Sequence, residues 1–223
     1  MKPDHELHRD IVAELNLDPS IRDEDIAVAV KDGVATLAGT VDDYAQRWAA
    51  ERAVEQVQGV RAIVNDLAVK LPGDNARSDS EIAHAALNAL RWDVQVPDHR
   101  ITVKVTDGWI MLEGEVEWNY QRDAASRAVR YLTGVKGVRN MLQLRKVASA
   151  ANVKQRITDM LRRQAEIDAG QIAVEVSGHT VILRGAVRSL NEKRDAERAA
   201  WNVPGVTTVE NDLLVSPPLG AAV

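Results

Sequence analysis

The histidines near the start of the chain are the residues that first suggest metal chemistry. His5 and His8 stand three residues apart, so on a helix their imidazoles would lie about one turn from each other. The HExxH zinc motif places its two histidines four residues apart, and this spacing differs from it. We therefore interpret His5 and His8 as solvated positions at the start of a helix. The other histidines fall on different expected elements: His84, His99 and His179.

Two short acidic runs raise the alternative of a cation site. The runs at 23–25 and at 42–43 come directly before an expected strand and an expected helix, respectively. Carboxylates before a helix cap its free N–H groups and favour its dipole. A calcium site needs oxygens that converge from several positions, and the runs show no such convergence. We therefore predict capping and no metal site.

The chain lacks the residue patterns of covalent and phosphate-handling enzymes. It contains no cysteine, which excludes a thiolate nucleophile, a disulfide and a cysteine metal site. It shows no glycine-rich phosphate loop, no nucleophile elbow and no Ser/His/Asp arrangement. We therefore expect a protein that is not an enzyme and that uses no cofactor.

The net charge of −5 is distributed unevenly along the chain. Residues 1–72 carry a net charge of −6, residues 73–147 carry +1 and residues 148–223 are neutral. Because binding to duplex nucleic acid needs a strongly basic surface, we expect no nucleic-acid partner. The acidic, amphipathic start lacks the apolar core of a secretion signal, and no apolar run is long enough to cross a bilayer. We therefore expect a cytoplasmic protein.

An internal repeat determines which helices and strands must hold any functional site in place. Stretches that begin at Ile26, Ile101 and Ile172 share one alternating pattern, at offsets of 75 and then 71 residues. Each indicates a strand with one buried face, a glycine-containing turn and a second strand. Further residues recur at the same offsets: Gly39, Gly114 and Gly185; Gly59, Gly134 and Gly205; Asn65, Asn140 and Asn211.

Each copy of the repeat also carries two expected helices. Small apolar residues recur at helical spacing after the second strand, and leading helices are expected near 5–17, 79–91 and 150–164. We predict an α+β fold of three tandem α-β-β-α-β modules, each a three-stranded mixed sheet with two helices on one face. The expected domains are 1–71, 77–147 and 149–217.

The recurring glycines are expected to determine the fold. Those that precede the second helix are Gly39, Gly114 and Gly185, each two residues before a valine. The second set is expected to cap the second helices with a left-handed backbone conformation. That set is Gly59, Gly134 and Gly205.

The aromatic residues are the best candidates for a contact surface. The chain has five tryptophans, three tyrosines and no phenylalanine. Four of these aromatics stand at positions where a sister copy carries a charged or polar residue, so we expect those positions to face outward. Exposed aromatics mark contacts with a partner or a lipid, and the alternative is contact with a neighbouring repeat. The four are Trp48, Trp118, Tyr131 and Trp201.

Charges on the outer sheet faces suggest a further hypothesis. The second copy carries Glu113 and Glu117 where the third carries Arg184 and Arg188. This opposition favours an orientation of modules against each other or against a second subunit. The alternative is two unrelated solvated faces, on which ion pairs contribute little.

The order of strand, Asp-Gly turn, strand, Gly-x-Val, helix and Gly-Val-x-x-Val/Ile-x-Asn resembles the BON domain family, and the resemblance covers nearly the whole chain three times. It implies the α-β-β-α-β fold and an association with membranes or phospholipids during osmotic or envelope stress. It also implies holdase-like chaperone behaviour in some members, and no shared catalytic residues. The best-known members are exported, which makes the periplasm the alternative location.

We therefore expect a bacterial, non-enzymatic, stress-associated protein that binds a membrane phospholipid surface or protein clients. The alternatives are a cytoplasmic adaptor or scaffold and a module that senses a small ligand or ion held between repeats. Association of the chain with a second copy of itself is a further alternative.

Overall fold

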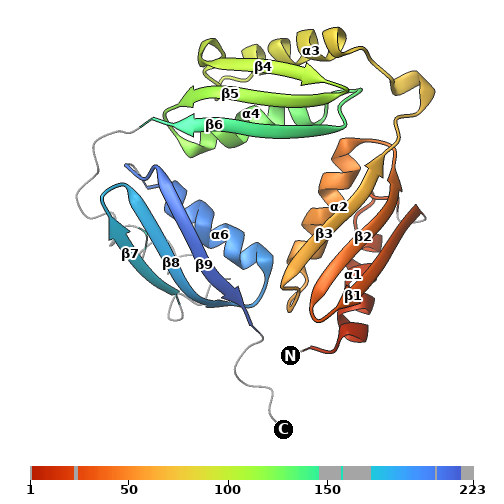
Figure 1. Cartoon of the computed structure of the whole chain (residues 1–223), viewed down its shortest axis with the longest axis vertical. Coiled ribbons are helices and arrows are strands. Elements are labelled where there is room, and N and C mark those ends of the chain that lie inside the picture. Colours follow the sequence, from red (N-terminus) through yellow and green to blue (C-terminus); the bar gives the residue numbers. More distant parts are fainter. Residues whose placement is uncertain (1, 23–24, 146–156, 158–171, 204, 217–223) are drawn as a thin grey trace. The chain divides into compact units, whose positions relative to one another are not determined.

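The computed structural model describes the chain except for residues 1, 23–24, 146–156, 158–171, 204 and 217–223 (Figure 1). Its strands form three separate three-stranded sheets, in the orders β1-β2-β3, β4-β5-β6 and β7-β8-β9. These sheets and their helices confirm the predicted α+β class and its repeating modules. We call the modules 1, 2 and 3 in chain order.

Module 1 contains α1 (Asp4–Leu17), β1 (Ile26–Lys31), β2 (Val34–Val41), α2 (Tyr44–Gln56) and β3 (Ala62–Val69). Module 2 contains α3 (Asp79–Trp92), β4 (Ile101–Thr106), β5 (Trp109–Val116), α4 (Asn119–Arg130) and β6 (Gly137–Leu144). Module 3 contains β7 (Ile172–Ser177), β8 (Thr180–Val187), α6 (Leu190–Trp201) and β9 (Thr208–Val215). Two short 3-10 helices, η2 (Gly73–Asn75) and η3 (Asp98–Arg100), precede α3 and β4.

The chain divides into two compact units. Unit 1 comprises Met1–Gly39, Ala49–Leu67 and Ala148–Val223, and unit 2 comprises Thr40–Trp48 and Ala68–Val147. The predicted leading helix at 150–164 lies outside the described residues except for Ile157, which is helical and fully buried in the core of module 3.

The sheet of module 2 shows why the pattern folds into layers. Strand β5 pairs antiparallel with β4 and parallel with β6, so the sheet is mixed. The alternating residues of β5 that point to one face, Ile110 and Leu112, are fully buried against Ile82 of α3 and Ala125 of α4. Both helices therefore cover the same face of this sheet, and the other face carries no helix of module 2 (Figure 1). Module 3 has the same mixed pairing.

The recurring glycines of the second strands allow the first strand to approach. Gly114 pairs with Ile101 and has a φ of +135°, and a Cβ atom on it would lie 2.1 Å from the carbonyl oxygen of Arg100. Gly39 has the same geometry, with a φ of +128° and the oxygen of Asp25 at 1.9 Å. A side chain at this position would displace the start of the neighbouring strand.

The second set of recurring glycines differs from the prediction of helix caps. Gly134 has a φ of +91°, but α4 ends at Arg130 and its C-cap residue is Tyr131. The glycine lies instead in the turn that leads from the helix to the last strand. Gly59 and Gly205 have φ angles of +97° and +91° and also lie in the turns beyond their helices.

Each leading helix of modules 1 and 2 holds the turn of its own hairpin. The two carboxylate oxygens of Asp79 accept hydrogen bonds from the backbone N–H groups of Asp107 and Gly108, both at 2.9 Å. Asp4 holds the corresponding turn of module 1 in the same way, at 2.8 and 3.0 Å. Asp107 and Gly108 both have positive φ angles, as a type I′ turn requires.

The recurring asparagines join the last strand to the second helix. The side-chain amide of Asn140 donates to the carbonyl oxygen of Arg122 at 2.8 Å and to Oγ of Ser126 at 2.7 Å. Its Oδ1 accepts the backbone N–H of Leu142 at 3.0 Å. Asn211 makes the equivalent bonds in module 3, to the carbonyl oxygen of Lys193 and to Leu213.

Candidate functional site

The four aromatics singled out from the sequence differ in their exposure. Tyr131 follows the end of α4 and is 61% exposed. Trp118, just before α4, is half-buried. Trp201, the last residue of α6, is also half-buried and packs against the core of module 3, while its Nε1 donates to Glu197 at 3.2 Å. Their contact with a partner or a lipid stays a prediction.

Trp48 contacts an arginine of another repeat within unit 2. The guanidinium carbon of Arg130, at the end of α4, lies 3.8 Å from the centre of the Trp48 ring. At this distance the cation is attracted to the face of the indole. The two residues belong to modules 1 and 2, so this pair is a contact between repeats.

A buried carboxylate marks the contact of α2 with α6 inside unit 1. Glu55 is only 6% exposed, and it pairs with Arg194 of α6 and with Arg52 of α2, the latter at 3.3 Å. Arg52 also donates to Oδ1 of Asn191 at 3.4 Å. Burial raises the pKa of the Glu55 carboxyl, against the opposing effects of Arg194 and Arg52. This cluster joins module 1 to module 3.

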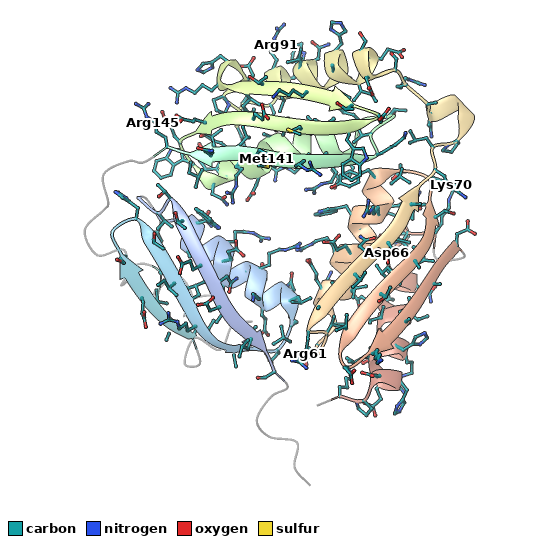
Figure 2. The ribbon with its side chains drawn as sticks, in the orientation of Figure 1. Arg61, Asp66, Lys70, Arg91, Met141 and Arg145 are labelled. Carbon is teal, nitrogen blue, oxygen red and sulfur yellow. The ribbon has the colours of Figure 1, made fainter. Side chains whose placement is uncertain are left out.

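The most exposed aromatic residue is one that sequence reasoning did not single out. Trp92, the last residue of α3, is 81% exposed, and Val94 two residues later is fully exposed. Arg91 is exposed beside them on the outer surface of α3 (Figure 2). Arg127 of α4 reaches the same loop and donates to Oε1 of Gln95 at 2.9 Å. We call Arg91, Trp92, Val94, Gln95 and Arg127 the Trp92 surface.

The repeat offers a signal for the Trp92 surface that the aromatic comparison missed. Trp92 corresponds, at the offset of 75 residues, to Leu17 at the end of α1. Leu17 is 75% exposed. An apolar residue recurs in both modules at a helix end outside the buried stripe, so the position is outward-facing although neither copy carries a charge there.

The outer face of the sheet in module 2 carries a second group of large side chains. Trp109 of β5 is 43% exposed and its ring lies directly on Gly137 of β6, where a Cβ atom would come within 2.3 Å of it. Met141 of β6 is 55% exposed on the same face (Figure 2), and Met111 alternates with the buried positions of β5. The face combines an indole with two polarisable thioethers.

The charges that motivated the hypothesis of opposed sheet faces are neutralised inside their own modules. Glu113 pairs with Lys104 at 2.6 Å and Glu117 pairs with Arg100 at 3.0 Å. In module 3, the partners of Arg184 are Glu175 at 3.0 Å and Asp212 at 3.7 Å, and Arg188 pairs with Glu192 at 2.6 Å. Each of these charges therefore has an ion-pair partner in its own module, and orientation of modules by the two faces stays a prediction.

The residues first considered for chemistry do not gather into a site. His5 and His8 are both exposed on α1, and no group of three or more histidine, aspartate or glutamate side chains in the described part of the chain could hold a metal ion. Asp43 accepts the backbone N–H of Gln46 at 2.8 Å, as the prediction of capping requires. In the other acidic run, Asp23 and Glu24 lie outside the described residues. No helix in the described ranges has the length and apolar character needed to cross a membrane.

Comparison with known proteins places these modules in a family. The BON domain model matches the chain three times, at residues 3–70, 78–146 and 149–217. The osmotically-inducible protein Y of Escherichia coli (strain K12) is 30% identical over 132 residues, which cover 56% of this chain. The aligned region spans 64% of the length of that relative.

Similarity to solved structures is weak. The C-terminal domain of CdsD, a structural protein of the type III secretion system of Chlamydia trachomatis, is 13% identical with a TM-score of 0.27. The alignment covers 97% of this chain and all of that one. At this score the likeness supports no conclusion about fold or function. The three family matches extend over most of the chain and coincide with its three sheets, and the protein therefore belongs to the BON domain family.

Proposed function

We propose that this protein is a non-enzymatic, stress-associated BON-domain protein that binds an anionic membrane surface through module 2. The single observation that carries the proposal is the exposure of Trp92 and Val94 beside Arg91 and Arg127. An indole with a flanking apolar side chain favours the interface between water and lipid, and the cations are attracted by acidic headgroups. The name of the Escherichia coli relative supports the association with osmotic stress.

The distribution of charge favours module 2 as the part that meets the membrane. Residues 1–72 carry a net charge of −6 and would be repelled by acidic lipids, whereas residues 73–147 carry +1. Each basic residue near such a surface contributes about 1 kcal/mol. Two cations and one pair of exposed apolar side chains therefore give weak, reversible binding to the membrane, and this binding depends strongly on ionic strength.

The test is co-sedimentation with vesicles of phosphatidylcholine that contain phosphatidylglycerol. We expect the wild-type chain to pellet with these vesicles at low salt and to be released at high salt. The double variant Trp92→Ser/Val94→Ser should lose most of the binding. Its matched control is Leu17→Ser, which removes the corresponding exposed residue from the acidic module 1. Equal binding by wild type and the double variant would exclude the Trp92 surface as the membrane site.

Protein clients are a second candidate, favoured by the outer face of the sheet in module 2. Trp109, Met111 and Met141 give an adaptable apolar surface of the kind that accepts varied partners. The test is the suppression of light scattering when reduced insulin chains aggregate. Trp109→Ser/Met141→Ser should weaken the suppression, and Trp92→Ser/Val94→Ser should leave it unchanged. The opposite pattern would assign client binding to the Trp92 surface.

A further inference from the structure

An open cavity of about 690 Å³ lies at the surface of unit 1. Its walls come from the hairpin turn and the start of β3 in module 1, and from the start of α6 and the end of β9 in module 3. Small-molecule sites in proteins commonly measure roughly 300–1,000 Å³. The volume of this cavity is therefore suited to a small ligand.

One cation of the cavity comes from module 1. Arg61 lies directly before β3 (Figure 2), and its backbone N–H donates to the carbonyl oxygen of Gly33 at 2.8 Å. The stem of its side chain crosses the turn, with Cδ 3.0 Å from the place where a Cβ atom of Gly33 would stand. The residue is nevertheless exposed. The turn thus fixes the stem of Arg61 and leaves its guanidinium able to bind an anion.

The second cation comes from module 3. Lys193 of α6 lines the same cavity, and its Nζ donates one hydrogen bond of 2.7 Å to the carbonyl oxygen of Leu213. An ammonium group has three donors, so this bond holds the side chain in place and leaves two N–H groups for a ligand. Arg61 and Lys193 therefore contribute two positive charges to the lining of the same cavity.

The rest of the cavity wall is largely apolar. Leu190, Leu214 and Val34 contribute to it, and Leu214 is 71% exposed, whereas the side chain of Leu213 is buried in the core of module 3. Among its described lining residues Asp32 is the acidic one, so the ionisable lining carries a net charge of +1. A ligand that fits this wall combines an anionic group with an apolar body.

We propose that this cavity binds a small soluble organic anion with an apolar tail, of the class of the medium-chain carboxylates. The carboxylate would be held by Arg61 and Lys193, since a guanidinium binds a carboxylate through two parallel hydrogen bonds. The tail would lie against Leu190 of α6 and Leu214 of β9. Because the walls come from both modules, the bound ligand stabilises the contact of module 1 with module 3.

The experiment is isothermal titration calorimetry of octanoate into the full chain. We expect octanoate to bind, with octanol and acetate each at least about tenfold weaker because one lacks the charge and the other the tail. Arg61→Gln should weaken octanoate binding at least about tenfold. Arg139→Gln, which removes the same charge from an exposed position of module 2, should leave it unchanged.

Three results would overturn the proposal: no binding of octanoate, equal binding of octanol, or equal binding by the wild-type and Arg61→Gln chains. Because the side chain of Arg61 is exposed, its replacement should not unfold the chain, and circular dichroism checks this. Lys193→Met tests the second cation, with thermal unfolding to confirm that it folds without the bond to Leu213.

Vesicle co-sedimentation separates this proposal from membrane binding. Arg61→Gln should bind vesicles as the wild type does, and Trp92→Ser/Val94→Ser should bind octanoate as the wild type does. If Arg61→Gln instead loses vesicle binding while octanoate fails to bind the wild type, the cavity recognises a lipid headgroup and the soluble ligand is excluded.

Discussion

The carboxylate of Glu55 on α2 and the guanidinium of Arg194 on α6 form an ion pair across 139 residues of the chain. The side chain of Glu55 is 8% exposed and that of Arg194 is 37% exposed. The carboxylate of Glu55 is therefore nearly excluded from solvent, whereas the guanidinium of Arg194 remains partly solvated. Desolvation disfavours the ionised carboxylate, so folding raises the pKa of Glu55 above its ordinary value of 4.5.

Removal of Arg194 should destabilise unit 1 in a manner that depends on pH. A carboxyl whose pKa is raised by folding contributes stability at low pH and loses that contribution as the pH rises through the raised value. In Arg194→Met the ionised Glu55 loses one of its two cationic partners and retains Arg52, so we expect a loss of about 1–3 kcal/mol at pH 7.5 and a smaller loss at pH 4.5. Thermal unfolding at the two pH values measures both.

Two variants serve as controls for this pair. Glu55→Gln removes the titrating group, and the difference in stability between pH 4.5 and 7.5 should shrink. Arg198→Met removes a more exposed cation from α6 and should change the free energy of unfolding by less than about 1 kcal/mol. A loss in Arg194→Met that is equal at both pH values would show that Glu55 does not titrate against it.

The bonds from Asp79 to the turn of module 2 should contribute to the stability of that hairpin. Asp79→Ala leaves the N–H groups of Asp107 and Gly108 without their two acceptors, and we expect a loss of about 1–2 kcal/mol. Asp79→Asn retains one acceptor oxygen and should lose less. Ser80→Ala, at an exposed neighbour on α3, is the control. Urea unfolding followed by circular dichroism measures the three, and similar midpoints for Asp79→Ala and Ser80→Ala would exclude the role.

Asn140 should contribute more to the stability of module 2 than an ordinary polar residue does. Its side chain satisfies the carbonyl of Arg122, the hydroxyl of Ser126 and the N–H of Leu142 in a partly buried position. Asn140→Ala should therefore lower the free energy of unfolding by about 2–3 kcal/mol. Gln143→Ala, at an exposed position on the same strand, should change it by less than about 0.5 kcal/mol. Hydrogen exchange should show the largest loss of protection at Leu142.

The fold could be predicted from the sequence because each copy of the repeat places its apolar residues at corresponding positions. The spacing of apolar residues predicted strands with one buried face and a small apolar helix face, and Ile110, Leu112 and Ala125 on these faces are fully buried. The role of Asp79 was not foreseen. Its counterpart in module 1 is Asp4, but the third copy carries Ala150 at that position, so the recurrence of the acid is incomplete.

The contact residues were harder to predict for a physical reason. The pair of Glu55 and Arg194 could not be predicted, because the spacing of residues on one helix does not reveal that a residue of another module meets it. The exposure of Trp92 could not be inferred from a charged counterpart, because the corresponding residue of module 1, Leu17, is also apolar. Long-range pairs depend on how modules dock, and a pattern within one repeat contains no information about docking.

Replacement of a recurring glycine should show whether its positive φ and the close approach of the neighbouring strand require glycine at that position. Gly114→Ala places a methyl group 2.1 Å from the carbonyl oxygen of Arg100, at a φ of +135° that alanine rarely adopts. We expect a loss of more than about 3 kcal/mol, because the start of β4 must move away from β5. Gly73→Ala is the matched control, since nothing lies within 4 Å of its added methyl group. It should change the free energy of unfolding by less than about 1 kcal/mol. If both variants unfold at the same denaturant concentration as the wild type, close approach of β4 is not what requires glycine at position 114.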